Sequence, residues 1–462
     1  MRKLVVLSSQ LNVRDFLSAG AFDALDDGKT FYTGGSDVLH EALTGRPTYV
    51  GAYELPQWRR ETYRKIRRLL LTSYRFRSRT ARVKLQQTPF VDRTVQKLAA
   101  LPGLRQLKIR AMMRKTGLNQ SLHKIVQEVR PDLIIVPSSG VDPVVVDTVR
   151  SAKELGIPVL ALVYNWDNLS SKAAFVVVPD YLGVGGFQAA QHAQQIHRIP
   201  RDRVAVLGSP YIDLHFTHPP GSTSSPFPFP YVLFAGCYQP FDELTALELL
   251  EQEIERSKLD LKVVYLPHPR RLRRRNDDFV DEPRFRHVVI EPRTRDDYVA
   301  EREKGKGRRQ PLPLDYYPAL LENAEFVACP LSTMMIEAAI FERRVLVIAY
   351  HDGVHPTSPG VAIKYLHFDG VDRVDTFEVC RDIGDLGPLF TRLAREKRPP
   401  ARPPKDQTDY YVYHDERPYS RRLKELVDQI GRARGLVDEP DDASRQVAES
   451  HSRTPSSAGP LP

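Results

Sequence analysis

Short apolar runs alternate with longer amphipathic stretches through the first 210 residues of the chain. This alternation is typical of a parallel sheet, whose buried strands are apolar throughout and are separated by helices. The predicted strands are KLVVLSS (3–9), PDLIIVPSS (131–139), IPVLALVYN (157–165), YLGVGG (181–186) and RVAVLGSP (203–210). The predicted helices are VRDFLSAGAFDAL (13–25), DPVVVDTVRSAKEL (142–155) and FQAAQHAQQIH (187–197).

The same pattern resumes at residue 231. The predicted strands are YVLFAG (231–236), LKVVYLP (261–267), RHVVIEP (286–292), EFVACP (325–330) and RVLVIAY (344–350). The predicted helices are DELTALELLEQEIERS (242–257), YYPALLENA (316–324) and the apolar stretch that begins at Ser332. We therefore expect an α/β protein built from two Rossmann-like, doubly wound domains that face a central cleft.

Changes in composition mark the boundaries of these units. Residues 218–230, HPPGSTSSPFPFP, have no periodicity and are expected to form a linker, so the predicted domains are 1–217 and 231–397. A Pro-rich piece precedes the helical pattern YSRRLKELVDQIGRAR, and we assign 398–436 to a C-terminal helical return segment. The polar residues 437–462 predict a disordered tail.

The chain has 462 residues, which is enough for two or three domains, and its 41% hydrophobic content suits ordinary globular cores. No apolar run approaches the roughly 20 residues that span a bilayer, and the start MRKLVVLSSQ turns polar too early for a signal peptide. Cys237, Cys329 and Cys380 are too few and too scattered for a disulfide framework or a zinc site. We expect a cytoplasmic protein.

The net charge of +9 is unevenly distributed along the chain. In residues 57–84, QWRRETYRKIRRLLLTSYRFRSRTARVK, arginines interleave with aromatic and leucine side chains. This mixture suits an anionic membrane surface and predicts peripheral attachment at the inner membrane face, although a solvated basic helix has the same composition. The shorter run RRLRRR, residues 270–275, is either a phosphate-facing loop or a solvated one.

The stretch CPLSTMMIEAAIFERRVLVI, residues 329–348, places two hydroxyls at the start of an apolar helix and one carboxylate inside it. Ser332 and Thr333 suit an N-cap, but a capping box needs an acid three residues later, where the chain has a methionine and an isoleucine. Glu337 has apolar neighbours, and a buried carboxylate needs a partner. Capping alone is one interpretation. The other is a phosphate-bearing ligand at the helix start, with its hydroxyls bound by Glu337.

Polar side chains follow other predicted strands, where parallel sheets bind their ligands. His268 lies between two prolines, and a lone histidine is as often structural. The loop YNWDNLSSK offers Asn165, Asp167 and Asn168 to a polyhydroxylated ligand, although Asn and Asp also stabilise turns. The remaining candidates are Asn12, Arg14 and Asp15 after the first strand, Ser138 and Ser139 after the second, and Gly208 and Ser209 in LGSPYID, where glycine permits close backbone approach.

Five motifs, RDFLSAGAFDAL, YNWDNLSSK, VAVLGSPYID, YLPHP and STMMIEAA, resemble in this order segments of GT-B type glycosyltransferases. The similarity covers both halves and is to bacterial surface-polysaccharide transferases of the CDP-glycerol and Kdo transferase-like groups. It implies an acceptor-binding first domain and a second domain that binds a nucleotide-activated donor through His268, Ser332, Thr333 and Glu337. Gly208 and Ser209 are further donor-binding candidates. The basic residues 302–310, REKGKGRRQ, depart from this pattern as a lengthened loop.

The expected reaction moves a sugar or polyol phosphate from a nucleotide sugar, or a CDP- or CMP-activated donor, to a hydroxyl of a cell-surface glycan or lipid-linked acceptor. Such a transfer needs a base for the acceptor hydroxyl and positive potential for the leaving phosphate. Asp15 and Asp167 are the candidate bases. Asp15 is slightly preferred because the loop after the first strand commonly faces the cleft centre in this fold. No DxD-like pair follows a strand, so we expect no metal and no cofactor.

Two other functions fit the same sequence. A sugar-nucleotide epimerase shares the architecture but would not need a membrane-seeking segment. A non-catalytic basic protein that binds a membrane or nucleic acid is compatible with the isoelectric point near 9.3. No recognised nucleic-acid motif accompanies the charge, so we expect no nucleic-acid partner.

Overall fold

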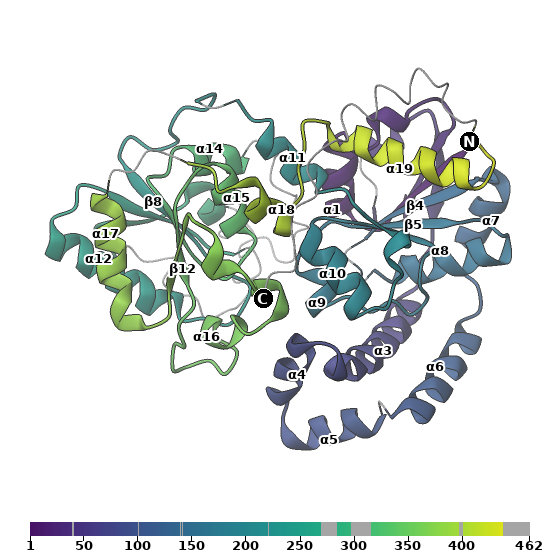
Figure 1. Ribbon diagram of the computed structural model, residues 1–462, viewed down its shortest axis with the longest axis horizontal. Coiled ribbons are helices and arrows are strands. Elements are labelled where there is room, and N and C mark those ends of the chain that lie inside the picture. The colour runs from purple at the N-terminus through teal and green to yellow at the C-terminus, as the bar shows by residue number, and fades with distance from the viewer. Residues whose placement is uncertain are drawn as a thin grey trace.

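The computed structural model describes residues 1–38, 41–99, 101–138, 140, 142–219, 221–268, 284–296, 316–396 and 401–437. The predicted basic run at 270–275, the lengthened loop at 302–310 and residues 438–462 of the predicted tail lie outside the described residues. Two α/β units lie side by side, each built around one sheet (Figure 1).

The first unit contains a parallel sheet of seven strands in the order β3-β2-β1-β4-β5-β6-β7. Its strands are β1 (Lys3–Leu7), β2 (Thr30–Gly35), β3 (Tyr49–Tyr53), β4 (Leu133–Ser138), β5 (Val159–Val163), β6 (Tyr181–Val184) and β7 (Val204–Val206). The sequence pattern predicted five of these and missed β2 and β3. Their threonines and glycines break up the apolar run, yet Thr30 and Thr33 are buried in the sheet.

The second unit contains a parallel sheet of six strands in the order β10-β9-β8-β11-β12-β13. Its strands are β8 (Tyr231–Ala235), β9 (Lys262–Leu266), β10 (Val288–Ile290), β11 (Val327–Pro330), β12 (Val345–Ile348) and β13 (Phe377–Cys380). Only β13 escaped the sequence pattern. The two parallel sheets confirm the predicted fold class of two doubly wound halves.

Helices cover both sheets, as the apolar strands require. The main ones in the two units are α7 (Gln120–Val129), α8 (Pro143–Glu154), α10 (Phe187–Gln195), α11 (Pro210–Phe216), α12 (Glu243–Ser257), α14 (Tyr316–Glu322), α15 (Met334–Ile340) and α17 (Leu386–Arg395). The helix predicted over 13–25 is instead a short α-helical turn, α1 (Gln10–Asn12), a π-helical turn at Val13–Ser18 and a 3₁₀ turn at Asp23–Leu25. Gly20 separates the last two because it has a left-handed φ of 72°.

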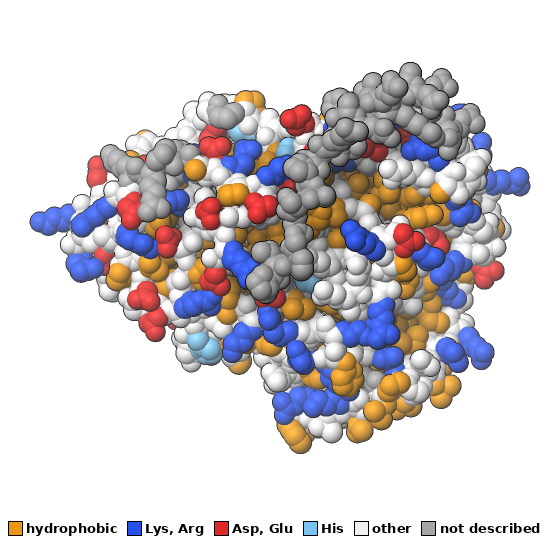
Figure 2. Space-filling model, in the orientation of Figure 1, with side chains coloured by type: hydrophobic (Ala, Val, Ile, Leu, Met, Phe, Trp, Pro, Cys, Tyr) orange, Lys and Arg blue, Asp and Glu red, His pale blue; other side chains and the backbone are white. Residues whose placement is uncertain are grey.

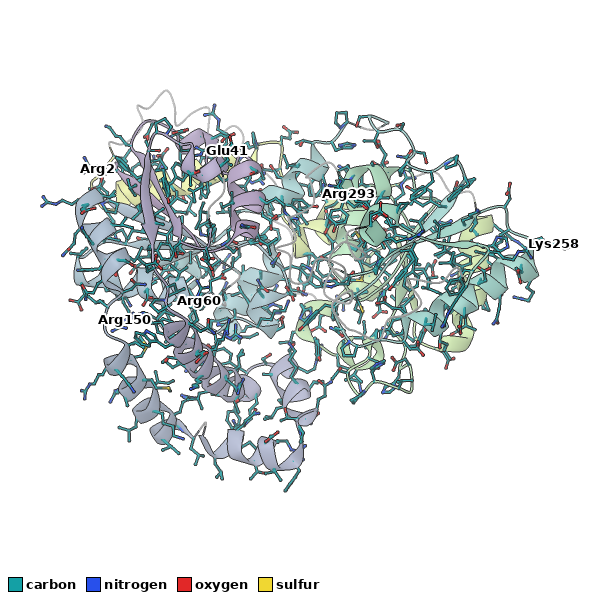
Figure 3. All side chains as sticks on the ribbon, turned by 180° about the vertical axis from the view of Figure 1, so that it is seen from behind. Arg2, Glu41, Arg60, Arg150, Lys258 and Arg293 are labelled. Atoms are coloured by element: carbon teal, nitrogen blue, oxygen red, sulfur yellow. The ribbon has the colours of Figure 1, made fainter. Side chains whose placement is uncertain are left out.

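An excursion of four helices leaves the first unit between β3 and α7: α3 (Gln57–Ser73), α4 (Arg79–Gln86), α5 (Phe90–Ala99) and α6 (Pro102–Thr116). It projects beyond the first sheet and returns to it (Figure 1). Arg59 of α3 is buried and forms an ion pair of 2.6 Å with the fully buried Asp147 of α8. Arg150 of α8, labelled in Figure 3, lies on the side of the excursion. It donates a hydrogen bond of 3.1 Å to Thr116 at the end of α6. Part of the segment predicted to meet a membrane is therefore internal.

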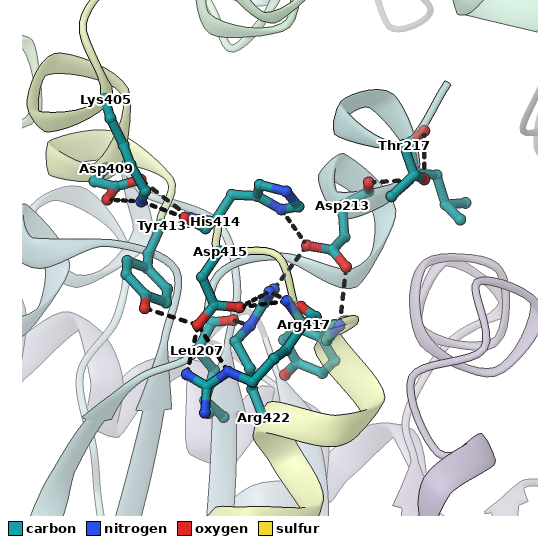
Figure 4. A network of polar contacts seen from close by, with 12 residues as sticks. Leu207, Asp213, Thr217, Lys405, Asp409, Tyr413, His414, Asp415, Arg417 and Arg422 are labelled. Atoms are coloured by element: carbon teal, nitrogen blue, oxygen red, sulfur yellow. Dashed lines mark hydrogen bonds and ion pairs between the residues drawn. The ribbon is translucent and has the colours of Figure 1, made fainter. Parts of the chain in front are cut away.

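The C-terminal return segment visits both units. The helix α18 (Lys405–Tyr411) adds Tyr411 to the core of the second unit, whereas α19 (Tyr419–Ala433) packs Leu423 and Val427 into the core of the first. A polar network holds the return segment against the first unit where the chain passes from α18 to α19 (Figure 4). In it, the Asp213 carboxylate of α11 accepts hydrogen bonds from His414 Nδ1 (2.8 Å), Arg422 Nη2 (2.7 Å) and the Tyr419 N–H (2.9 Å).

The predicted linker at 218–230 is tied to the second unit. The Glu322 carboxylate of α14 accepts a hydrogen bond of 3.2 Å from the Thr223 N–H and further ones from the Gly221 N–H and the Thr223 hydroxyl. Phe227 packs edge-on against Tyr231 at the start of β8, with ring centroids 5.1 Å apart. Within the described residues, the helices are all too short or too polar to cross a membrane.

Candidate functional site

A cavity of about 510 Å³ lies between the two units, against loops at the carboxyl ends of their strands. The first unit contributes Lys84, Gln87, Asn165, Trp166, Asp167, Ser171 and Lys172 to its lining. The second contributes Tyr238, Gln239, Pro240, His268, Leu331, Ser332, Thr333, Thr357, Tyr365, His367 and Phe368. The cavity therefore brings together five residues singled out in the sequence, namely Asn165, Asp167, His268, Ser332 and Thr333.

The wall from the first unit is charged. It is formed by the loop between β5 and the short helix α9 (Asn168–Ser171), together with α4 of the excursion. Lys172 Nζ pairs with the Asp167 carboxylate at 2.6 Å, and Lys84 Nζ donates to the Ser171 carbonyl at 3.1 Å. Although burial alone would raise the pKa of Asp167, the charge and hydrogen bond of the Lys172 ammonium, with the charge of Lys84, outweigh it and lower that pKa. Burial, with the charge of Lys172, lowers the pKa of Lys84 to about 8.

The wall from the second unit carries hydroxyls. Thr333 stands at the N-cap position of α15 in an α-helical conformation, and its side chain makes no capping hydrogen bond. The Oγ atom of Ser332 is shielded from solvent and has no hydrogen-bond partner among the described residues, the weakly bonding Cys329 thiol being its neighbour. Capping therefore does not use either hydroxyl, and a role of Ser332 and Thr333 in ligand binding stays a prediction.

Aromatic and imidazole rings fill the remaining lining. The rings of Tyr238 and His268 lie 5.8 Å apart, on loops that follow β8 and β9. His367 bonds Ser170 of α9 across the units, with 2.8 Å between Nδ1 and Oγ. Burial lowers the pKa of His367 to about 3, so this imidazole is neutral at pH 7. The Trp166 ring packs edge-on against Phe368 at 5.4 Å.

Asp15 and Glu337 lie outside the lining of the cavity, in a second polar cluster between the units. The Asp15 carboxylate pairs with Arg14 Nε at 2.6 Å and accepts a hydrogen bond of 2.9 Å from the Tyr164 hydroxyl. Burial raises the pKa of Asp15 despite these two partners, and the charge of Glu337 adds to the rise. Glu337 lies 3.3 Å from His215 Nε2 of α11. The partner that a buried carboxylate needs is thus supplied within the protein, and a donor contact for Glu337 stays a prediction.

The other predicted site residues lie around these two clusters. Asn12 donates its amide to the Ser8 hydroxyl and the Pro137 carbonyl, both at 2.9 Å. Ser138 bonds the Asp142 carboxylate at 2.9 Å. Gly208 has a φ of 86° and leaves no room for a Cβ beside the Tyr413 carbonyl, so its close backbone approach is to the return segment. Asn168 and Ser209 are buried, and Ser139 lies outside the described residues.

Lys84, Gln87, Tyr365 and His367 are cavity residues that sequence reasoning missed. Lys84 belonged to the basic run 57–84, whose composition predicted a membrane-facing surface. No pattern in the sequence indicates that residue 84 lies near residue 167. Lys172 stood in the YNWDNLSSK loop, where its proximity to Asp167 was the available signal. The one described group with ligand atoms close enough for a metal is Glu251, Glu255 and His287, which does not line the cavity.

No protein-family description matches this chain, and no curated protein matches its sequence. Solved structures do align with nearly the whole chain. The UDP-GlcNAc 2-epimerase from Methanocaldococcus jannaschii aligns at a TM-score of 0.51 with 12% identity, over 92% of this chain and 99% of that one. A putative UDP-N-acetylglucosamine 2-epimerase from Listeria monocytogenes aligns at a TM-score of 0.51 with 11% identity, over 95% of this chain and 98% of that one. The structure of S. aureus MnaA with UDP aligns at a TM-score of 0.50 with 12% identity, over 96% of this chain and 99% of that one.

At such low identity these alignments show the fold alone. The chain has the GT-B fold, two Rossmann-like units with a cavity between them. The narrower resemblance to CDP-glycerol and Kdo transferase-like groups stays a prediction.

Proposed function

We propose that this protein is a glycosyltransferase that uses a nucleotide-activated donor bound in the cavity between the two units. The observation that carries the proposal is the meeting of two complementary walls. Lys84, Lys172 and Asp167 come from the first unit, and the hydroxyls of Ser332 and Thr333, which make no capping hydrogen bond, come from the second. A cavity of about 510 Å³ is within the range of small-molecule sites.

The donor phosphates would lie between the hydroxyls of Ser332 and Thr333 and the ammonium groups of Lys84 and Lys172. Fixed positive charge in a partly dehydrated site stabilises the negative charge that develops on a leaving phosphate. This arrangement makes the transfer independent of a metal. His268 and Tyr238 would pack on the donor from the same side.

Asp167 is the better placed of the two candidate bases because it lines the cavity and Asp15 does not. The lowered pKa of Asp167 keeps it ionised at neutral pH, so it can accept the proton of an acceptor hydroxyl. Asn165, on the same loop, would orient that acceptor. Asp15 would act at a distance by holding Tyr164, which precedes this loop.

A sugar-nucleotide epimerase is the second candidate. The observation that favours it is the alignment of this chain, over nearly its whole length, with proteins named as UDP-GlcNAc 2-epimerases. An epimerase would bind its nucleotide sugar in the same cavity but would change it without any acceptor. The aligned structures include a complex with UDP and an enzyme named for UDP-GlcNAc, which makes uridine nucleotides the first ligands to test.

Calorimetry with UDP, CDP, CMP and their sugar or polyol derivatives tests the shared part of both candidates. We expect one nucleotide to bind, with the affinity reduced in Ser332→Ala and Lys172→Met. The matched control is Lys124→Met, which removes a largely exposed ammonium on α7. If no nucleotide binds, both candidates fail.

Incubation of the bound nucleotide sugar without an acceptor, followed by NMR, separates the two candidates. Conversion to a second nucleotide sugar would establish the epimerase. An unchanged donor that loses its sugar only when a glycan or lipid-linked acceptor is added would establish the transferase.

A further inference from the structure

The excursion helix α6 has two apolar faces, although the fold uses only one of them. Its inner face places Ile109, Met112 and Met113 against a small cluster built on Tyr63 and Ile66 of α3. This contact joins α6 to α3 and α8 of the first unit. The apolar side chains on its opposite side have no such role.

The unused side continues onto α5 and the turn between the two helices. Six large apolar side chains there are between 44% and 72% exposed. We call them the outer face: Phe90, Val91, Leu98, Leu101, Leu104 and Leu107. Figure 2 shows hydrophobic side chains along this outer edge of the excursion, with lysine and arginine side chains beside them. A row of this kind on one edge marks an interaction site, unlike scattered exposed residues.

The charge around the outer face is predominantly positive. Residues 57–117 contain 18 lysines and arginines but only two acids, Glu61 and Asp92, whereas the whole chain has a net charge of +9. The excursion is thus strongly basic and the rest of the protein is net acidic. Among the described residues, Lys97, Lys108 and Arg110 form no ion pair.

The outer face also begins close to the cavity. Gln87 lines the cavity, and Phe90 follows it by three residues, which span at most about 10 Å. The helix α4, which directly precedes Gln87, is anchored to the second unit, because Arg79 Nε donates to the Lys364 carbonyl at 2.7 Å and the Thr80 hydroxyl accepts from the Leu366 N–H at 2.8 Å. A surface bound by the outer face would therefore lie next to the mouth of the cavity.

We propose that the outer face of α5 and α6 docks on the surface of an anionic lipid bilayer. Exposed leucines and a phenylalanine enter the acyl boundary, and the unpaired lysines and arginines bind lipid phosphates. Nucleic acid could bind the lysines and arginines through its phosphates, but it would leave the leucines exposed to water. A second copy of the chain could bury the leucines, but it would bring two positively charged surfaces together. Membrane binding by the outer face does not depend on which reaction the protein catalyses. The additional inference that the acceptor is lipid-linked rests on the proposed function.

Vesicle co-sedimentation of the full chain tests this proposal. We expect binding to mixed phosphatidylcholine–phosphatidylglycerol vesicles, weaker binding in high salt, and little binding to phosphatidylcholine alone. The double variant Leu104→Ser with Leu107→Ser should reduce the binding about ten-fold, and Lys97→Glu with Lys108→Glu should do the same. The matched control, Leu155→Ser with Ile383→Ser, changes exposed apolar residues elsewhere and should bind as the unaltered protein does.

Equal binding to neutral vesicles, or binding that survives both double variants, would overturn the proposal. So would a dimer in sedimentation that Leu104→Ser with Leu107→Ser dissociates, or binding to arbitrary DNA in place of vesicles. Nucleotide affinity in vesicle-free buffer is the separate readout: it should be equal in all variants, which also shows that they are folded. If vesicles bind but no nucleotide does, the proposed function fails and the membrane surface stands.

Discussion

Ser170 and His367 belong to different units, and Ser170 Oγ lies 2.8 Å from His367 Nδ1. Both side chains are buried, and the Trp166 ring packs edge-on against the imidazole at 5.2 Å. This hydrogen bond joins the loop that carries Asp167 to the loop after β12. It therefore helps to set the distance between the two walls of the cavity.

Removal of the Ser170 hydroxyl should destabilise the protein by about 1–3 kcal/mol, because it leaves a buried imidazole nitrogen without its partner. Urea unfolding of Ser170→Ala measures this change. In Ser171→Ala, the lost bond of 2.7 Å is to the Asp167 carbonyl of the same turn, and we expect a smaller effect. An equal loss of unfolding free energy in the two variants would show that the hydrogen bond between the units stabilises the protein no more than one within a single turn.

The affinity for a nucleotide sugar should fall as the pH rises from 7 to 9. The pKa of Lys84 is lowered to about 8, so its ammonium is present below that pH and is lost above it. At pH 9 the loss corresponds to at most about ten-fold in affinity. Calorimetry across this range measures the change. Lys84→Arg should bind with little pH dependence because arginine stays charged, and an identical slope in this variant would assign the titration to the ligand or another group.

Asp213→Asn should destabilise the protein by about 1.5–3 kcal/mol, because Arg422 and His414 lose a charged hydrogen-bond partner and Arg422 keeps only its contact of 3.1 Å with Asp415. Burial opposes the ionisation of Asp213, but His414 and Arg422 outweigh it and lower the pKa of this carboxyl. The stability it supplies is therefore present above the unfolded-state pKa near 4 and is lost as the pH falls through the lower folded-state value. Urea unfolding at pH 7 measures the difference.

The matched control for Asp213 is Glu425→Gln. Glu425 pairs with Arg417 at 2.6 Å, but both side chains are about half exposed. Such a pair contributes about 0–1 kcal/mol. A loss in Asp213→Asn as small as that in Glu425→Gln would mean that the network of Figure 4 does not fasten the return segment.

Replacement of Glu337 by alanine should weaken donor binding by about 1.5–3 kcal/mol if this carboxylate accepts hydrogen bonds from donor hydroxyls. The Glu337–His215 contact offers the competing explanation, in which the carboxylate only supports α11. Calorimetry with the donor, together with urea unfolding, separates the two. Loss of stability with unchanged donor affinity in Glu337→Ala would remove Glu337 from the donor site.

Asp167→Asn should abolish turnover and retain donor binding, whereas Asp15→Asn should keep most of its turnover. The physical reason is position, since Asp167 lines the cavity and Asp15 is closed off by Arg14 and Tyr164. Steady-state rates and donor affinities of the two variants provide the comparison. The reverse result would restore Asp15 as the base, as the loop after the first strand suggested.

Much of the fold was accessible from the sequence because buried parallel strands are continuous apolar runs. The apolar runs at 133–138 and 231–235, for example, predict buried strands, and both are fully buried strands in the structure. The strands β2 and β3 were missed because threonine and glycine interrupt their apolar runs, although the neighbouring strands bury the threonines and glycines of β2. Five of the eighteen cavity residues could be selected from their place after a strand, namely Asn165, Asp167, His268, Ser332 and Thr333.

By itself, the sequence determined the two α/β units and the polar loops at the ends of their strands, since hydrophobic period and turn chemistry are local properties. Tertiary structure alone decided which polar residues meet. It brought Lys84 of the excursion to Asp167, turned Glu337 toward His215, and placed leucines of α5 and α6 on the outside. The physical reason is that burial, pairing of charges and exposure depend on contacts between segments far apart in the chain, which no local pattern encodes.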